Sequence, residues 1–168
     1  MGENGHARGA YLDLLTRWLR DVSKSTTTAA APAGPAGHAG VHRKLIEEFR
    51  ANKGQLMSGP MAGSRPMLLT TTGAKSFAER TVVIGFRPYG DKYAAIASNN
   101  GAPINPHWFA NLTANPVATV EIGEEKFQVK ARVAEGQERV EVAKLIDYLE
   151  RQQALTSREI PVVVLERI

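Results

Sequence analysis

Two short polar stretches hold most of the residues whose types and spacing suit ligand chemistry. The first is TTTGAKSFAER, residues 70–80, where an apolar run ends at Gly73 and is followed by Lys75, Ser76 and Arg80. A glycine there permits unusual backbone angles and a close approach of a ligand. An arginine can hold a phosphate by a bidentate fork, and a lysine can do so as a point charge. The stretch suits a phosphate site, although a lysine and an arginine on a surface turn are more often only hydrated.

The second stretch is ASNNGAPINPHW, residues 97–108, in which a polar turn over residues 98–101 follows an apolar run. Asn105 suits the N-cap of a short helix and Pro106 its first position. The free N–H groups of that helix would face a carbonyl or an anion. On residue types alone, Trp108 is slightly more typical of core packing than of a pocket wall.

Several kinds of site are excluded or disfavoured by the sequence. The chain has no cysteine, which excludes disulfides, thiolate metal sites and cysteine nucleophiles. It contains no G-x-S-x-G, no Walker loop and no G-x-G-x-x-G motif. His38 and His42 have no cluster of carboxylates near them in the sequence, so we expect no metal site. An enzyme of this composition needs a bound organic cofactor to carry the difficult chemistry.

Composition and charge indicate a globular chain of 168 residues with 43% hydrophobic and 23% charged residues. No apolar run approaches the roughly 18 residues of a membrane span, and no secretory signal is recognisable, so we expect a cytoplasmic protein. The net charge is +4, and most of the basic excess lies in residues 1–53, which suits an anionic partner there. With only 7% aromatic residues, a nucleic-acid platform is disfavoured.

The N-terminal part divides into a helix and a linker. Residues 10–22 place apolar side chains at helical spacing, which suits either contact with a membrane or docking on the protein's own domain or a subunit partner. Residues 25–40 are rich in Ala, Pro and Gly and are typical of a linker. A short helix is expected over residues 42–52.

The remainder favours an antiparallel sheet. Strands are expected over 66–73, 80–86, 92–98, 117–123, 126–135 and 160–168, and a helix over 137–153. The pairs 80–86 with 92–98 and 117–123 with 126–135 are expected to be hairpins, the first with a loop of four or five residues at 88–91. Six strands with short connections favour a β-barrel of the α+β class with an N-terminal helical extension. The expected division is residues 1–41 and residues 42–168.

The segments IEEFRANKG, PMLLTTTGAKS, AIASNNGAPINPHWFANLTANPVATVEIG, ARV and IPVVVLERI together resemble the deazaflavin-dependent nitroreductase family, whose members use reduced coenzyme F420. LLTTTG followed by lysine, combined with NPHWFANLTANP, is specific, and the resemblance covers about residues 42–168. It implies an antiparallel split β-barrel of the FMN-binding-like kind with flanking helices. It also implies a deazaflavin in a groove and often a homo-oligomer.

The resemblance also implies roles for particular residues. Lys75 and Arg80 are expected to bind the phosphate of the cofactor, with Ser76 and Thr81 beside them. The residues expected to line the ring of the cofactor are Ser98, Asn99, Asn105, Trp108, Phe109 and Asn111. The implied reaction is hydride transfer to an enone, an unsaturated lactone, a quinone or a nitro compound, with the Ser98 hydroxyl as an orienting group or proton source.

This chain departs from the family pattern near the expected site. Phe77 and Glu79 stand where a glycine and a proline are usual, and Ile84 or Gly85 replaces an aromatic residue. The loop before the last strand offers Tyr148 as its only aromatic side chain. These departures leave the acceptor open and keep two alternatives in view, an FMN-binding oxidoreductase and a deazaflavin carrier without turnover.

Overall fold

The computed structural model describes residues 36–58 and 62–168, and the chain divides into two compact units, Met1–Ser64 and Arg65–Ile168. The predicted helix at residues 10–22 and most of the predicted linker lie outside the described residues. The expected division between residues 41 and 42 stays a prediction.

Helix α2 of the first unit, Ala36–Ala51, begins before the predicted start at His42, so the prediction of a linker up to residue 40 was too long. No proline interrupts residues 36–51, and lengthening an existing helix costs far less than starting one. The helix ends where the sequence predicted. Gly54 has a φ of 85° and donates its N–H to the Phe49 carbonyl at 2.8 Å, which satisfies a carbonyl of the last turn.

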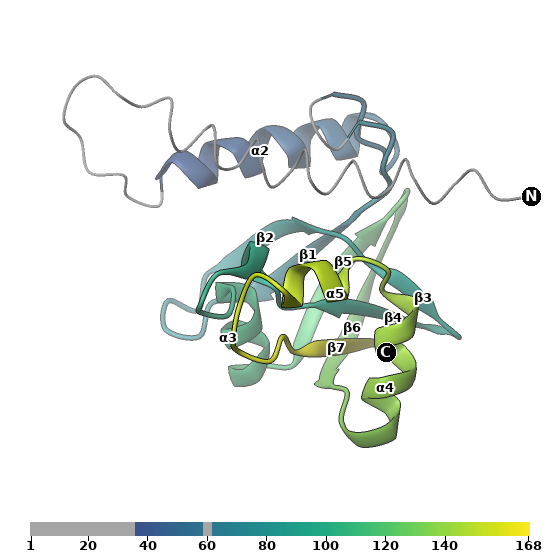
Figure 1. Ribbon diagram of the computed structural model, residues 1–168. Coiled ribbons are helices and arrows are strands. Elements are labelled where there is room, and N and C mark those ends of the chain that lie inside the picture. The colour runs from purple at the N-terminus through teal and green to yellow at the C-terminus, as the bar shows by residue number, and fades with distance from the viewer. Residues whose placement is uncertain (1–35, 59–61) are drawn as a thin grey trace, which may run out of the picture. The chain divides into compact units, whose positions relative to one another are not determined.

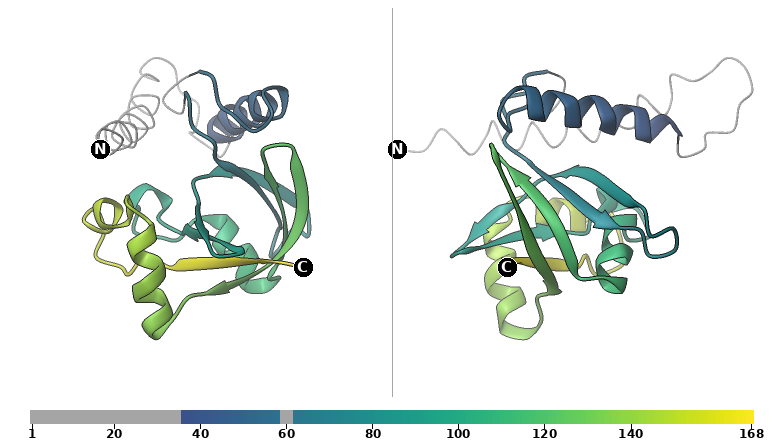
Figure 2. Two further views of the ribbon diagram at one scale, coloured as in Figure 1. Left: turned by 90° about the vertical axis from the view of Figure 1, so that its right-hand side faces the viewer. Right: turned by 180° about the vertical axis from the view of Figure 1, so that it is seen from behind.

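The second unit is built on one antiparallel seven-stranded sheet with the order β2-β1-β5-β6-β7-β4-β3. Its strands are β1 Met67–Thr72, β2 Glu79–Ile84, β3 Arg87–Tyr89, β4 Lys92–Ile96, β5 Val117–Ile122, β6 Glu125–Val133 and β7 Val162–Arg167. The sheet curls into a half-barrel rather than a flat layer, and helix α3, His107–Ala114, lies beside it (Figures 1 and 2). The predicted split-barrel architecture of the α+β class is confirmed.

The first predicted hairpin was wrong. Strand β2 pairs with β1, and β4 pairs instead with β3 through a two-residue turn at Gly90-Asp91, so the predicted long loop is itself a strand. Pro88 cannot donate a ladder hydrogen bond, which suits the short edge strand β3. The second predicted hairpin is confirmed, because Ile122 pairs with Glu125 across the turn between β5 and β6.

The core lies inside the curled sheet. Alternate side chains along each strand face inward, as the period of two requires. The fully buried members include Met67, Leu69, Val120, Val129 and Leu165. Trp108 and Leu112 of helix α3 pack into the same cluster. Helix α3 is therefore fixed to the sheet by its apolar face.

The predicted helix over 137–153 is two helices, α4 Gly136–Leu145 and α5 Leu149–Gln153. Ile146, Tyr148 and Leu149 are all buried at the break between them. A straight helix advances about 100° per residue, so Ile146 and Leu149 would share one side, but Tyr148 would point about 160° away from Ile146. The break lets all three reach the core.

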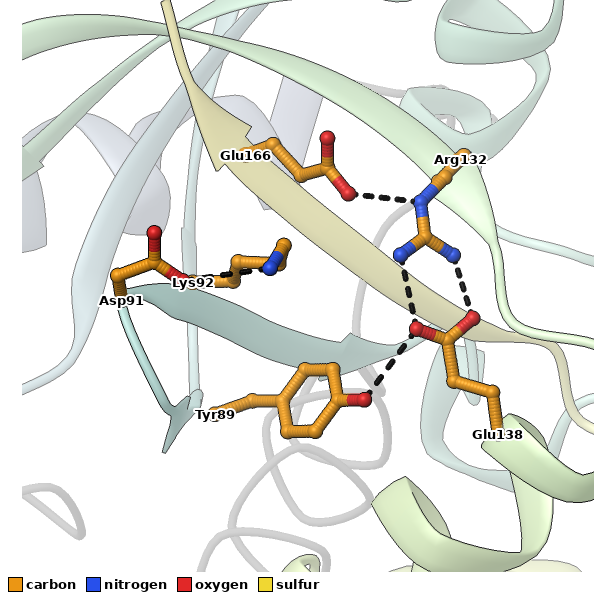
Figure 3. A network of polar contacts seen from close by, with 6 residues as sticks. All are labelled: Tyr89, Asp91, Lys92, Arg132, Glu138 and Glu166. Atoms are coloured by element: carbon orange, nitrogen blue, oxygen red, sulfur yellow. Dashed lines mark hydrogen bonds and ion pairs between the residues drawn. The ribbon is translucent and has the colours of Figure 1, made fainter.

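A polar network fastens α4 to the sheet (Figure 3). Arg132 of β6 donates from Nη2 to Glu138 Oε1 at 2.8 Å and from Nε to Glu166 Oε1 of β7, also at 2.8 Å. The Tyr89 hydroxyl of edge strand β3 donates to Glu138 at 3.3 Å. Hydrogen bonding and charge from Arg132 lower the pKa of Glu138. One carboxylate therefore joins α4 to β3 and β6.

Candidate functional site

A tight turn follows β1 at Gly73. The Gly73 N–H donates to the Ala78 carbonyl at 2.8 Å, and the Phe77 N–H donates to the Gly73 carbonyl at 2.9 Å. Ser76 Oγ lies inside the turn and accepts the Ala78 N–H at 3.3 Å. A Cβ on residue 73 would lie 2.4 Å from that Oγ, so the turn in this form requires glycine.

Two predicted phosphate ligands lie on this turn and at the start of β2. Lys75 and Arg80 are both exposed, and neither side chain has a hydrogen bond or ion pair with a residue of the described ranges 36–58 and 62–168. The Thr81 hydroxyl shares a hydrogen bond of 2.7 Å with the hydroxyl of Thr70 across β1 and β2. The turn thus presents two uncompensated cations on a fixed backbone.

Asn111 connects helix α3 to this turn. Its side chain is buried, its Oδ1 accepts the Ala74 N–H at 3.0 Å, and its Nδ2 donates to Thr71 Oγ1 at 3.0 Å. Sequence reasoning placed Asn111 against the cofactor ring. The structure shows that two of its polar atoms hold the glycine turn, and a contact with the ring stays a prediction.

The two aromatic residues of α3 differ in exposure. Trp108 is 7% exposed within the core cluster, as expected from residue types alone. Phe109 is half-buried, and its ring meets that of Trp108 edge-on with centroids 6.3 Å apart. Phe109 therefore offers more free surface to a ligand than Trp108 does.

The polar turn before α3 has an unusual backbone. Asn99, Asn100 and Gly101 have φ values of 48°, 54° and 75°, which place three successive residues in the left-handed region. Asparagine tolerates this region better than most residues. The Asn99 side chain donates to the Ile104 carbonyl at 3.1 Å, which closes the loop. A Cβ on Gly101 would lie 2.4 Å from Leu155 Cβ, so glycine is required at this contact.

Asn105 does not cap helix α3, contrary to the prediction. The cap residue is Pro106, which makes no side-chain capping bond. Asn105 Oδ1 instead accepts a hydrogen bond of 2.7 Å from Arg158 Nη1. A charged donor gives a stronger hydrogen bond than a backbone N–H does, so the tertiary contact prevails over the local one.

Arg158 is a residue that sequence reasoning missed. Its guanidinium donates to the carbonyls of Ala97 (3.1 Å), Ser98 (2.8 Å), Ala102 (2.9 Å) and Ile104 (3.2 Å). These acceptors lie more than fifty positions away in the sequence, so no local spacing could have connected them to Arg158. The only local signal was an arginine close before an apolar closing strand.

Ser98, the predicted proton source, is half-buried at the end of this loop. Its carbonyl accepts from Arg158 and from the Gly101 N–H, the latter at 2.9 Å. Its hydroxyl has no hydrogen-bond partner among the described residues, and the geometry leaves it available to a ligand.

Tyr148 occupies the space left by a missing side chain. Its hydroxyl lies 3.2 Å from the position that a Cβ on Gly85 would take. That hydroxyl is buried without a hydrogen-bond partner, and burial raises the pKa of Tyr148 to about 12. The Arg87 guanidinium lies 4.9 Å from the centre of the ring. Gly85, which replaces an aromatic residue of the family pattern, thus leaves space for the side chain of Tyr148.

Among the described residues, no group of three or more His, Asp or Glu side chains could hold a metal ion. In the same part of the chain, no helix has the length and apolar character required to cross a membrane.

Comparison with known proteins identifies the family. The model of the F420H(2)-dependent quinone reductase family matches residues 41–167. The chain belongs to this family. It is 32% identical over 140 residues to the F420H(2)-dependent quinone reductase of Mycobacterium tuberculosis strain H37Rv, a match that covers 77% of this chain and 93% of that protein.

Solved structures agree with this membership. The F420-H2 dependent reductase FDR-A is 38% identical, with a TM-score of 0.56 over 60% of this chain and 93% of that chain. A structure described as a domain-swapped dimer is 32% identical, with a TM-score of 0.57 over 79% of this chain and all of that one. The family's quinone reductases are oxidoreductases, and their hydride donor is reduced F420. Membership therefore confirms the predicted reductase class and donor, against the FMN and carrier alternatives.

The residues of this family member fit a phosphate-bearing cofactor. Lys75 and Arg80 are exposed beside the glycine turn, and neither has a protein partner among the described residues. An anion bound there would not have to displace an existing ion pair.

Proposed function

We propose that this reductase transfers a hydride from reduced F420 to a quinone. The observation that carries the proposal is the pair of uncompensated cations on a glycine turn that Asn111 ties to helix α3. The named activity of the relatives supports a quinone as acceptor. Enones, unsaturated lactones and nitro compounds are the other acceptors of suitable electron demand.

In this proposal, Arg80 holds the cofactor phosphate with its planar fork, and Lys75 adds a mobile point charge. The Ser76 hydroxyl accepts the Ala78 N–H, and its own hydrogen is free to donate to a phosphate oxygen. Thr81 braces the start of β2 through Thr70. When bound, reduced F420 supplies the hydride.

The chain's own contribution to the reaction is orientation and proton supply. Ser98 would donate a hydrogen bond from its free hydroxyl to an acceptor oxygen, and would relay a proton from water to that oxygen, regaining its own proton from the water. The half-buried face of Phe109 would exclude water from one side. Holding two reactants in a fixed orientation can supply several kcal/mol of barrier reduction.

The test is turnover with purified protein. Reduced F420 is mixed with menadione, and appearance of oxidised F420 is followed by absorbance. Protein-dependent, saturable oxidation is expected with the quinone. If the protein oxidises reduced F420 only with enones or nitro compounds, the acceptor class is wrong.

We also propose that the protein is a cytoplasmic homo-oligomer. The sheet order leaves β2 and β3 as edge strands, and one similar solved chain is described as a domain-swapped dimer. Light scattering of the full chain tests the assembly, and a single monomeric mass would refute it. Sedimentation of the full chain and of a variant lacking residues 1–41 with anionic vesicles tests the predicted membrane contact of residues 10–22.

A further inference from the structure

The side chain of Arg158 forms hydrogen bonds with several residues of one loop, residues 97–105. All its hydrogen bonds described above go to residues of the segment 97–105. Four of the acceptors are backbone carbonyls, and the fifth is Asn105 Oδ1. No carboxylate of the described residues forms an ion pair with this guanidinium. Its contacts therefore specify a loop shape rather than neutralise a charge.

The loop would not keep this shape by local preference. Asn99 and Asn100 are non-glycine residues with left-handed φ values of 48° and 54°. Such conformations cost free energy and persist only where the surroundings over-determine them. The Arg158 bonds to the carbonyls of Ser98, before these residues, and Ala102, after them, supply that constraint from both sides.

Arg158 is itself held in place. Gln153 Nε2 donates to the Arg158 carbonyl at 2.7 Å, and Gln153 Oε1 accepts the Ile160 N–H at 3.0 Å. Leu155, from the same segment, packs against Gly101. The guanidinium therefore starts from a fixed backbone, and its fork is already aimed at the loop.

We propose that Arg158 is a positioning residue of the reductase. It holds the loop of residues 97–105, which contains Ser98 and Asn99, in the shape that hydride transfer needs, without touching the reactants. The role in turnover rests on the proposed function. The grip on the loop is a property of the protein alone. A lysine cannot replace it, because an ammonium has three donors and lacks the planar fork that reaches several acceptors at once.

The first arm of the test needs no cofactor. Amide hydrogen exchange of residues 97–105 is compared in the wild type, Arg158→Lys, Arg158→Ala and the control Arg167→Ala. Arg167 is a matched surface arginine that pairs with Glu125 at 3.0 Å on the far end of β7. We expect exchange to speed up by about tenfold or more in both Arg158 variants, since each lost bond to a charged donor is worth roughly a factor of ten. The control should match the wild type.

The second arm measures turnover of reduced F420 with menadione. We expect kcat to fall about tenfold or more in both Arg158 variants, because the loss of one hydrogen bond from a charged donor is worth roughly a factor of ten. The dissociation constant of F420 should change less than about threefold, because Lys75 and Arg80 are untouched. Millimolar guanidinium should restore part of kcat in Arg158→Ala, and ammonium should not. If Arg158→Ala does not fold, Arg158→Lys decides both arms.

The outcomes separate the two proposals. Wild-type exchange rates over 97–105 in a folded Arg158 variant would overturn the inference. So would an equal loss of kcat and of cofactor affinity, because that indicates general damage to the site. If the wild type itself does not turn over quinones, the proposed function fails, while the exchange arm still decides whether Arg158 holds the loop.

Discussion

The side chain of Asn111 donates to Thr71 Oγ1 at 3.0 Å, so helix α3 is bonded to the C-terminal end of strand β1. The same amide accepts the N–H of Ala74 beyond the glycine. Two side-chain hydrogen bonds therefore hold the helix that carries the aromatic residues against the turn that carries the cations. Because Trp108 anchors that helix in the core, core packing and site geometry are coupled.

Replacing Asn111 tests this coupling. We expect Asn111→Ala to lower the free energy of unfolding by about 2 kcal/mol, because it leaves the buried Thr71 hydroxyl and the part-buried Ala74 N–H without their partner. It should also weaken F420 binding severalfold, since the cation-bearing turn loses its support. Chemical denaturation and fluorescence titration measure the two effects. Asn115→Ala, at the exposed end of the same helix, should leave cofactor affinity near the wild-type value.

The phosphate assignment makes its own prediction. Lys75→Ala and Arg80→Ala should each weaken F420 binding by about tenfold or more, since a hydrogen bond to a charged group is worth about 1.5–3 kcal/mol. Glu79→Gln should strengthen it slightly by removing a nearby negative charge. Titrations at two salt concentrations check this, with Lys126→Ala as an exposed control on β6. Unchanged affinity in both cation variants would place the phosphate elsewhere.

Phe77 is strained, and the strain is testable. It has a φ of 57° and its side chain is 80% exposed. The left-handed backbone costs free energy, and burial of the side chain offsets little of that cost. We expect Phe77→Gly to raise the free energy of unfolding by about 1 kcal/mol, because glycine adopts this backbone without strain. Phe77→Ala separates the two causes. If alanine stabilises the protein as much as glycine does, removal of the exposed ring is the cause and not the backbone.

The Tyr148 hydroxyl predicts an alkaline effect. Its pKa is raised from 10.0 to about 12 by burial, so the folded protein holds this proton more tightly than the unfolded chain does. The resulting stability is fully present below pH 10 and is lost as the pH rises toward 12. Denaturation curves across that window should fall more steeply in the wild type than in Tyr148→Phe. At neutral pH the variant should be as stable as the wild type, because the hydroxyl it loses has no partner; a large loss would mean that the hydroxyl is bonded after all.

Glu138 predicts the opposite behaviour in acid. Arg132 lowers its pKa, so the folded protein holds this proton less tightly than the unfolded chain does. Its contribution is therefore present above the ordinary glutamate pKa and is lost as the pH falls through the lowered one. Stability measured between neutral pH and the acid limb should decline less steeply in Glu138→Gln than in the wild type. Glu150→Gln, at an exposed position on α5, should keep the wild-type slope.

Local patterns account for much of the fold. Short continuous runs of apolar and β-branched residues marked the strands at Met67–Thr72 and Val162–Arg167, and the Gly123-Glu124 turn marked the hairpin of β5 and β6. These features depend on neighbours a few residues apart. The short strand Arg87–Tyr89 was missed because its pairing depends on its place at the sheet edge and not on its own composition.

The candidate site shows the same division. The sequence by itself identified the family and predicted the candidate residues of the site: the glycine, the two cations, the serine and the aromatic helix. Only the tertiary structure decided how they are held. Asn111 accepts a hydrogen bond from the glycine turn, and Asn105 accepts one from Arg158 instead of capping helix α3. The Tyr148 hydroxyl lies beside Gly85. The reason is that each of these contacts joins residues dozens of positions apart, and only the curled sheet brings them within hydrogen-bonding or packing distance.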